Sequence, residues 1–349
     1  MSGKKIRALI VDDSAAMRQL LTHILSSDPE IEIVGTASDP FIAREKIVAL
    51  SPDVITLDVE MPRMDGLTFL EKLMRGRPTP VVMVSSLTQA GCDVTLRALE
   101  LGAIDYFAKP TFDTLNGVSD GADLIIEKVK AAARARVLPK TAPARPIAAA
   151  PSALSGAAAY QLTNRIIAIG ASTGGTEAIR EVLSQLPANS PGIVMVLHMP
   201  PGFTASYAKR LDSLCNIRVK EAENGDRVLP GHALLAPGSF HMSLLKSGAE
   251  YSVRVAEGPP VNRHRPSVDV LFDSCAALAG RNVNAAILTG MGDDGARGLR
   301  RMRDAGAYTV AQDEATCVVF GMPKEAIAQG GVQDVLPLQC IAERLLTHK

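Results

Sequence analysis

Short runs of apolar, β-branched residues alternate along the chain with longer amphipathic stretches. This alternation is typical of parallel α/β sheets, in which helices connect neighbouring strands. In the first part we predict strands at 7–11, 32–36, 54–57, 80–85 and 105–108. In the second part we predict strands at 166–169, 193–197, 233–236, 284–289, 308–312 and 332–335. Helices are expected between them, starting after Thr176, Phe203, Val268, Ala296 and Pro323, with a β-hairpin between about 216 and 260.

Residues 131–164 interrupt this pattern with a stretch rich in Ala, Pro, Ser and Arg that contains few large apolar side chains. Such a segment buries too little apolar surface to offset its ordering entropy, so we predict a linker. A chain of 349 residues is also too long for one comfortable core. We therefore expect three parts: a domain at 1–128, a flexible Ala/Pro-rich linker at 129–164 and a second domain at 165–349.

The charge balance and the cysteines exclude several classes of protein. Lys plus Arg and Asp plus Glu both number 37, so no overall basic surface is available for nucleic acid or anionic membranes. The five cysteines form no C-x-x-C pair, which argues against a disulfide framework or a zinc site and favours a cytoplasmic location. No apolar stretch approaches about 18 residues, so we do not expect a membrane-inserted protein.

Carboxylates gather at strand ends in the first domain. Asp12 and Asp13 end the first predicted strand and Asp58 ends the third, while Ser85 and Lys109 end the fourth and fifth. The carboxyl ends of parallel strands meet at one edge, where three carboxylates repel one another unless they bind a hard cation such as Mg²⁺. Alternatively, the aspartates are helix N-caps, although the combined spacing of all five residues disfavours that interpretation.

These residues resemble the receiver domain of two-component response regulators, a flavodoxin-like fold with a five-stranded parallel sheet. The resemblance covers 4–128 and implies that Asp58 accepts a phosphoryl group from a histidine kinase. It also implies that Asp12, Asp13 and Asp58 hold Mg²⁺, and that Lys109 pairs with the phosphoryl oxygens. Ser85 and Tyr106 would then respond to the added charge, since a phosphoryl group forms new charge-assisted hydrogen bonds.

The second domain begins with "IIAIGASTGG", a buried strand that ends in glycines around one serine. Gly170, Gly174 and Gly175 miss the G-x-G-x-x-G spacing of a dinucleotide site, and no G-K-[ST] phosphate loop is present. The stretch 170–174 instead fits G-x-S-x-G, which lifts Ser172 above the sheet at the start of a helix. A plain tight turn is the alternative.

His198 ends the second strand of this domain, where a dinucleotide fold would carry an acid. If the first two strands are neighbours, the imidazole lies near Ser172 and can act as its base. The loop "LTGMGDDGARG" then offers Asp293 and Asp294 as carboxylates to orient the imidazole. The order Ser, His, Asp differs from that of α/β-hydrolases, so that fold is disfavoured.

The other histidines have a structural interpretation first, because His232 and His241 flank the predicted hairpin without metal-ligand spacing. His264 lies between Arg263 and Arg265. This loop either borders the active site, where its Arg and His side chains would contact an acidic partner helix, or is purely structural, with Ser267 capping the next helix. The sequence leaves both possibilities open.

The second domain also resembles the catalytic domain of chemoreceptor glutamate methylesterases of the CheB type. The resemblance rests on "IGASTGG", "VLHMPPGFT", "ENGDRVLPGHALLAPG", "GPPVNRHRPSVDVLF", "LTGMGDDGARG" and "AQDEATCVVFGMPKEA". It implies a doubly wound, mostly parallel α/β fold and a triad of Ser172, His198 and Asp294. Met291 would contribute its backbone N–H to the oxyanion hole, and Thr173 would lie beside the substrate.

The resemblance implies hydrolysis of glutamate γ-methyl esters on methyl-accepting chemoreceptors, with methanol released and no cofactor needed, and it permits deamidation of glutamine. We further expect the receiver to inhibit the esterase until a chemotaxis-type histidine kinase phosphorylates Asp58. Two other interpretations remain: a regulator whose output is only binding, in which Ser172 has no catalytic role, and a nucleotide-dependent enzyme. The kinase, the receptors, the pathway and the oligomeric state are not defined by the sequence.

Overall fold

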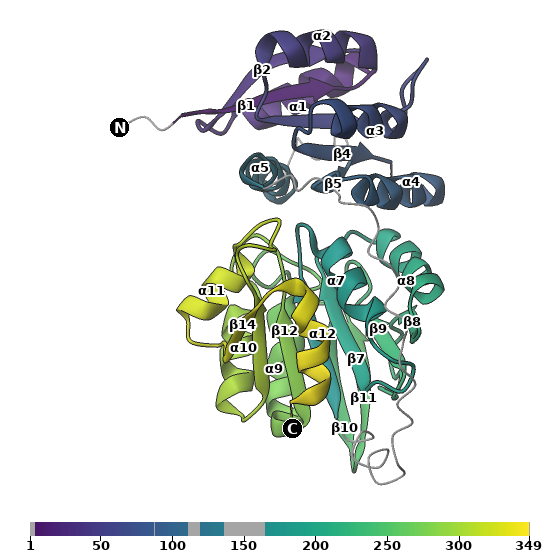
Figure 1. Ribbon diagram of the computed structural model, residues 1–349, viewed down its shortest axis with the longest axis vertical. Coiled ribbons are helices and arrows are strands. Elements are labelled where there is room, and N and C mark those ends of the chain that lie inside the picture. The colour runs from purple at the N-terminus through teal and green to yellow at the C-terminus, as the bar shows by residue number, and fades with distance from the viewer. Residues whose placement is uncertain (1–3, 87, 111–118, 136–164, 349) are drawn as a thin grey trace. The chain divides into compact units, whose positions relative to one another are not determined.

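A computed structural model describes residues 4–86, 88–110, 119–135 and 165–348 (Figure 1). The chain divides into two compact units, Met1–Pro143 and Ala144–Lys349. Each is an α/β structure built on a parallel sheet, as the strand pattern predicts. The end of the expected linker at 164 stays a prediction.

The first unit contains a five-stranded sheet in the order β2-β1-β3-β4-β5, and every neighbouring pair is parallel. Strands β3 and β4 are buried along their whole length, as expected where helices cover both faces of a sheet. The elements are β1 (Ile6–Val11), α1 (Ala15–Ser26), β2 (Ile31–Ala37), α2 (Pro40–Leu50), β3 (Val54–Asp58), α3 (Gly66–Gly76), β4 (Val81–Ser85), α4 (Gln89–Glu100), β5 (Asp105–Ala108) and α5 (Ser119–Arg134).

Helix α5 continues further than the sequence analysis expects. It ends at Arg134, so 129–134 are helical and do not begin a linker. Alanine is the strongest helix former, and Val129, Ala131 and Ala132 are buried in the unit. Lys130 adds ion pairs to Asp28 and Glu30 at 3.0 and 2.7 Å. The remainder of the expected linker, 136–164, lies outside the described residues.

The second unit contains a seven-stranded sheet in the order β14-β13-β12-β6-β7-β9-β8. All of its pairs are parallel, and the hairpin β10–β11 forms a separate antiparallel sheet. The strands are β6 (Ile166–Ala171), β7 (Gly192–Leu197), β8 (Arg218–Glu221), β9 (His232–Leu235), β10 (His241–Ser247), β11 (Glu250–Ala256), β12 (Val283–Ile287), β13 (Tyr308–Gln312) and β14 (Asp334–Leu336). The helices are α7 (Gly175–Ser184), α8 (Phe203–Leu214), α9 (Val268–Leu278), α10 (Ala296–Asp304), α11 (Met322–Ala328) and α12 (Leu338–Thr347), with a 3₁₀ turn at Gly280–Asn282.

Successive side chains of the central strand β6 point to opposite faces of the sheet, so helices pack on both faces. Ile166 and Ala168 belong to the buried cluster that contains Phe272 of α9 and Leu299 of α10. Helices α7 and α12 contact each other, and α12 also packs on β12. Strand β8, with four residues at one edge of the sheet, and helix α12, with ten residues, were not predicted from the sequence.

Strand β6 pairs with β7 on one side and with β12 on the other. The chain runs from β6 to β7 and only later returns to β12, so the direction of winding reverses beside β6. In open parallel sheets, ligands bind outside the carboxyl ends of the strands at such a switch point. The loops after β6, β7 and β12 therefore define the edge at which a site is expected.

Candidate active site

Ser172 lies on a tight turn between β6 and α7. Its backbone N–H donates to the carbonyl of Thr289 at 3.0 Å, and its carbonyl accepts from Gly175 N–H at 2.6 Å. Gly174 has φ of 76°, and a Cβ added there would lie 2.6 Å from Cβ of Val318. Glycine is required at this position by both the left-handed backbone and the lack of space. The backbone conformation of the turn is therefore fixed by the hydrogen bonds of Ser172 and by the steric limit at Gly174.

The loop after β12 packs directly against this turn. A Cβ added to Gly290 would lie 2.8 Å from Cβ of Ser172, so only glycine permits the approach. Thr289 Oγ1 donates to the carbonyl of Thr173 at 3.0 Å and accepts from Val319 N–H at 3.0 Å. These contacts hold the residues around Ser172 in one conformation.

His198 is the first residue after β7, and its N–H donates to the carbonyl of Ala171 at 3.2 Å. Its Nε2 lies 2.8 Å from Oδ2 of Asp294, a residue from the loop before α10 that is only 1% exposed. Asp293, the other candidate carboxylate, is exposed. The structure therefore pairs His198 with the second aspartate of the loop.

Asp294 accepts hydrogen bonds on both carboxylate oxygens. Oδ1 accepts from Asn262 Nδ2 and Ser267 Oγ, both at 2.7 Å, and Oδ2 accepts from Val268 N–H at 2.6 Å. Burial alone would raise the pKa of Asp294, but the hydrogen bonds from His198, Asn262 and Ser267 lower it well below its ordinary value. Asp294 therefore remains a carboxylate at neutral pH.

The charge of Asp294 determines the tautomer of His198. A carboxylate can only accept, so Nε2 of the neutral imidazole carries the proton and donates to Asp294. The other ring nitrogen, Nδ1, is buried and has no hydrogen-bond partner among the described residues. Its lone pair is left to take a proton from a neighbouring group.

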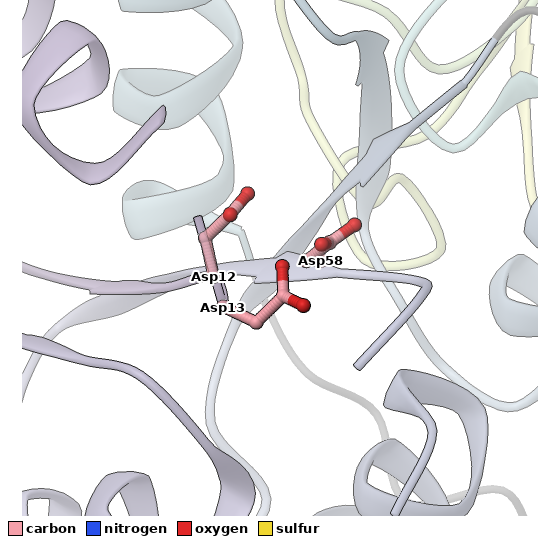
Figure 2. A group of neighbouring side chains, drawn as sticks. All are labelled: Asp12, Asp13 and Asp58. Atoms are coloured by element: carbon pink, nitrogen blue, oxygen red, sulfur yellow. The ribbon is translucent and has the colours of Figure 1, made fainter. Parts of the chain in front are cut away.

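The first unit holds a second cluster, formed by Asp12, Asp13 and Asp58 at the carboxyl edge of its sheet (Figure 2). One oxygen of each carboxylate lies within 4.8 Å of the others. Burial and the charge of Asp58 raise the pKa of Asp12 to about 6. Burial also raises the pKa of Asp58, although Lys109 opposes it by donating to Oδ2 at 2.9 Å.

The donor set of this cluster fits a hard divalent cation. All three ligands are carboxylate oxygens, which Mg²⁺ prefers, and Asp12 Oδ2 is buried with no hydrogen-bond partner among the described residues. A bound cation would satisfy that oxygen and relieve the mutual repulsion that raises the pKa of Asp12. Asp12, Asp13 and Asp58 are the residues that would hold it.

Ser85 and Tyr106 are the two residues expected to respond to phosphorylation. Ser85 Oγ accepts from Thr95 Oγ1 at 2.7 Å and lies 3.2 Å from the carbonyl of Gly91, so it is bound to α4. Tyr106 is buried, and Lys128 Nζ lies 5.3 Å from the centre of its ring. No hydrogen bond joins Ser85 to Asp58 within the described part of this unit.

Each of the two units matches a known protein family. Residues 167–345 match the profile of the CheB methylesterase family, and 8–117 match that of the response regulator receiver domain. A protein-glutamate methylesterase/protein-glutamine glutaminase of Salmonella typhimurium is 59% identical over 342 residues, which cover 98% of this chain and 96% of the relative. The chain belongs to the CheB methylesterase family.

Two further matches agree with this membership in the CheB family. A protein-glutamate methylesterase/protein-glutamine glutaminase 2 of Cupriavidus pinatubonensis is 57% identical, over 100% of this chain and 97% of the relative. The crystal structure of the CheB methylesterase catalytic domain from Thermotoga maritima is 43% identical, with a TM-score of 0.52. It covers 53% of this chain and 98% of that domain. No helix in the described part of this CheB-family chain is long and apolar enough to cross a membrane.

The loops that carry Ser172, His198 and Asp294 meet at one edge of the CheB-type sheet. His198 and Asp294 are hydrogen-bonded, whereas no hydrogen bond joins the Ser172 hydroxyl to His198 among the described residues. Met291 is half-buried in the loop after β12, and its N–H donates to no described residue. Thr173 is buried, with its carbonyl held by Thr289.

The loop 261–267 also borders this edge, and the roles of its residues were missed or left undecided by the sequence. The His264 ring stacks on that of His198, with centroids 3.6 Å apart and planes 11° from parallel. Asn262 contacts Asp294 and was not considered at all. Ser267 occupies the N-cap position of α9, but it makes no side-chain capping bond and donates to Asp294 instead.

The remaining histidines have the structural contacts expected of them. His241 is buried, and its Nε2 lies 2.9 Å from the carbonyl of Pro259 while Nδ1 accepts from Ser267 N–H. His232 is exposed and lies 3.0 Å from the carbonyl of Pro230. No local pattern marks Asn262 or His264 as different from these, because their partners lie about 30 residues or more away in sequence.

Proposed function

We propose that this CheB-family chain hydrolyses the γ-methyl esters of protein glutamates, with Ser172 as nucleophile, His198 as general base and Asp294 as the group that orients the base. The observation that carries the proposal is the buried His198–Asp294 pair, which leaves Nδ1 without a hydrogen-bond partner among the described residues, at the end of the strand that pairs with β6. The names of the relatives, protein-glutamate methylesterase/protein-glutamine glutaminase, support the substrate class.

In the first half of the reaction, Ser172 Oγ attacks the γ-carbonyl carbon of the ester and gives its proton to His198 Nδ1. Asp294 accepts from the other ring nitrogen and stabilises the imidazolium as it forms. The oxyanion that develops needs preorganised donors, and Met291 N–H is one that no described residue engages. A single such donor contributes about 10²- to 10³-fold in rate.

The collapse of the tetrahedral intermediate breaks the bond to the methoxy group. His198 returns its proton to the leaving oxygen, methanol departs, and the acyl group remains on Ser172. A water molecule, deprotonated by the same imidazole, then hydrolyses the acyl-enzyme to a free glutamate. Glutamine would pass through the same acyl-enzyme with ammonia as leaving group, so deamidation of receptor glutamines is part of the proposal.

Regulation is assigned to the receiver unit, where Asp58 is the proposed phosphorylation site. Bound Mg²⁺ would neutralise charge on the phosphoryl oxygens. Lys109, which already donates to Asp58, would pair with one of them. The added charge would draw Ser85 away from its hydrogen bonds to α4, and Tyr106 would repack with it. The unphosphorylated receiver inhibits the esterase.

The proposed partners follow from these two activities. A chemotaxis-type histidine kinase supplies the phosphoryl group, and methyl-accepting chemoreceptors supply the ester. All five cysteines are free, which agrees with the cytoplasmic location expected from their spacing. That location stays a prediction.

The test measures methanol release from methylated chemoreceptor by the wild type and by Ser172→Ala, each with and without a small phosphodonor and Mg²⁺. We expect release by the wild type, a higher rate with phosphodonor, and none by the variant. Phosphodonor-dependent binding to receptor without methanol release would instead favour a regulator that acts only by binding. Methanol release by Ser172→Ala at the wild-type rate would remove the serine from the mechanism.

A further inference from the structure

The segment between the hairpin and α9 contains a tight turn with unusual backbone angles. Val261 and His264 exchange two backbone hydrogen bonds, with lengths of 3.0 and 2.9 Å. The two residues between them, Asn262 and Arg263, have φ of 50° and 66°. Positive φ at both central residues is the mark of a type I′ turn.

The left-handed backbone of this turn is energetically unfavourable for one of its two central residues. Type I′ turns favour glycine, asparagine and aspartate at the central positions, and Asn262 meets that preference. Arg263 does not, because its Cβ is crowded in the left-handed region. Strained backbone of this kind persists where the surroundings hold it, and it is concentrated at functional sites.

Two side chains of this turn contact the His198–Asp294 pair. Asn262 Nδ2 donates to Asp294 Oδ1 and to Asp269 Oδ2, both at 2.7 Å. Arg297 holds Asn262 from the other side by donating to its Oδ1 at 2.9 Å. Asn262 therefore holds the Asp294 carboxylate in place. The same turn places the His264 ring on the face of the His198 imidazole.

One hydrogen bond cannot fix the plane of an imidazole. The bond from Nε2 to Asp294 anchors one edge of His198 but allows the ring to pivot about that contact. The His264 ring lies 3.6 Å away and within 11° of parallel, so it opposes any such rotation. With the ring plane held, Nδ1 points in one direction, which proton transfer from a hydroxyl requires.

We propose that His264 is a positioning residue that fixes the ring plane of His198 by stacking on it. The inference rests on the proposed role of His198 as base. It requires a flat ring at position 264 and no particular chemistry of that ring. Phenylalanine should replace it, and alanine should not.

The kinetic test compares His264→Ala, His264→Phe and a matched histidine control, His232→Ala, whose ring is exposed and lies 3.0 Å from the carbonyl of Pro230. In methanol release from methylated receptor, we expect kcat of His264→Ala to fall about tenfold, as for the loss of a good aromatic pair, with KM unchanged. His264→Phe should recover most of kcat, and His232→Ala should match the wild type. A loss that phenylalanine does not restore would overturn the proposal.

A second readout does not depend on esterase activity. Two-bond proton–nitrogen spectra of protein labelled with ¹⁵N-histidine report the tautomer of each ring, and His198→Gln identifies the His198 signals. We expect the tautomer protonated at Nε2 in all three proteins, with sharp His198 signals in the wild type and in His264→Phe and signals broadened by ring motion in His264→Ala. Unchanged His198 signals in His264→Ala would overturn the proposal. Absence of methanol release by the wild type would reject the proposed function alone, because the spectra still decide the role of His264.

Discussion

Nε2 of His198 donates to Oδ2 of Asp294 across 2.8 Å, and this bond joins the ends of two strands that lie on opposite sides of β6. Four further donors, two side chains and two backbone N–H groups, converge on the same carboxylate. Asp294 is therefore ionised and immobile before any substrate binds. The tautomer of His198 follows from that single fact.

Replacing Asp294 with asparagine should abolish most of the esterase activity. An amide can turn its NH₂ group toward Nε2, which would place the imidazole proton on Nδ1, where the proposed mechanism needs a lone pair. The corresponding change in serine hydrolases lowers kcat by about 10⁴-fold. We expect a fall of about 10³- to 10⁴-fold in methanol release.

The matched control for this variant is Asp293→Asn. Asp293 is the adjacent residue, is exposed, and carries the same charge. Methanol release should stay at the wild-type rate in this control. Equal losses in the two variants would show that the loop, and not the carboxylate at 294, is what the reaction requires.

The lowered pKa of Asp294 also predicts how stability depends on pH. Because the folded pKa lies below that of the unfolded chain, the carboxylate contributes stability above the ordinary value of about 4. This contribution is lost as the pH falls through the folded pKa. Asp294→Asn removes it at every pH. The free energy difference between wild type and variant should therefore be largest near neutrality and shrink in acid.

Urea unfolding of the full chain, repeated from neutral pH down to about pH 3, measures this difference. The transition that Asp294→Asn displaces identifies the second unit. Asp293→Asn should give a curve parallel to the wild type, since the side chain of Asp293 is exposed. A constant gap between wild type and Asp294→Asn over the whole range would contradict the lowered pKa.

The parts of the site that follow from strand order were predictable from sequence. Ser172 and His198 end strands that a parallel α/β pattern makes neighbours, so their approach required only the correct strand assignment. The choice of Asp294 over Asp293 came from the family motif, because both lie in one loop and no periodicity separates them. The structure adds the reason, which is that only Asp294 is buried beside His198.

The supporting residues could not be predicted, because their roles arise from long-range packing. Ser267 precedes a helix and fits the N-cap pattern, yet the buried carboxylate of Asp294 is a stronger acceptor and takes its hydroxyl. Asn262 and His264 lie in a turn whose left-handed backbone suits Asn262 but is not indicated by the arginine at position 263. The helical residues 129–134 were also misassigned, since alanine was judged by its small buried area and not by its helix propensity.

A methyl group at position 290 should disrupt the turn that carries Ser172. In Gly290→Ala the new Cβ would lie 2.8 Å from Cβ of Ser172 and 2.3 Å from Sδ of Met322. Met322 can move, but the backbone of Ser172 is fixed by its bond to Thr289. We expect a loss of about 1–3 kcal/mol in unfolding free energy and a marked fall in kcat.

Gly76→Ala is the control, because an added Cβ at that helix end meets nothing within 4 Å. Circular dichroism and urea unfolding measure the stability of both variants, and methanol release measures their activity. Wild-type activity in Gly290→Ala would show that the Ser172 turn tolerates displacement, contrary to its proposed role.

Asp58→Asn should leave the chain unable to respond to a phosphodonor. Asp58 is a buried carboxylate of the cluster of Asp12, Asp13 and Asp58, and Lys109 Nζ already donates to it at 2.9 Å, where a phosphoryl oxygen would be stabilised. We expect no stable incorporation of radioactive phosphate and a rate of methanol release fixed at the level seen without phosphodonor. Glu71→Gln, which removes a half-exposed carboxylate that pairs with Arg75 of its own helix, should respond like the wild type. Activation of Asp58→Asn by the phosphodonor would place the phosphorylated residue elsewhere and remove the cluster of Asp12, Asp13 and Asp58 from the switch.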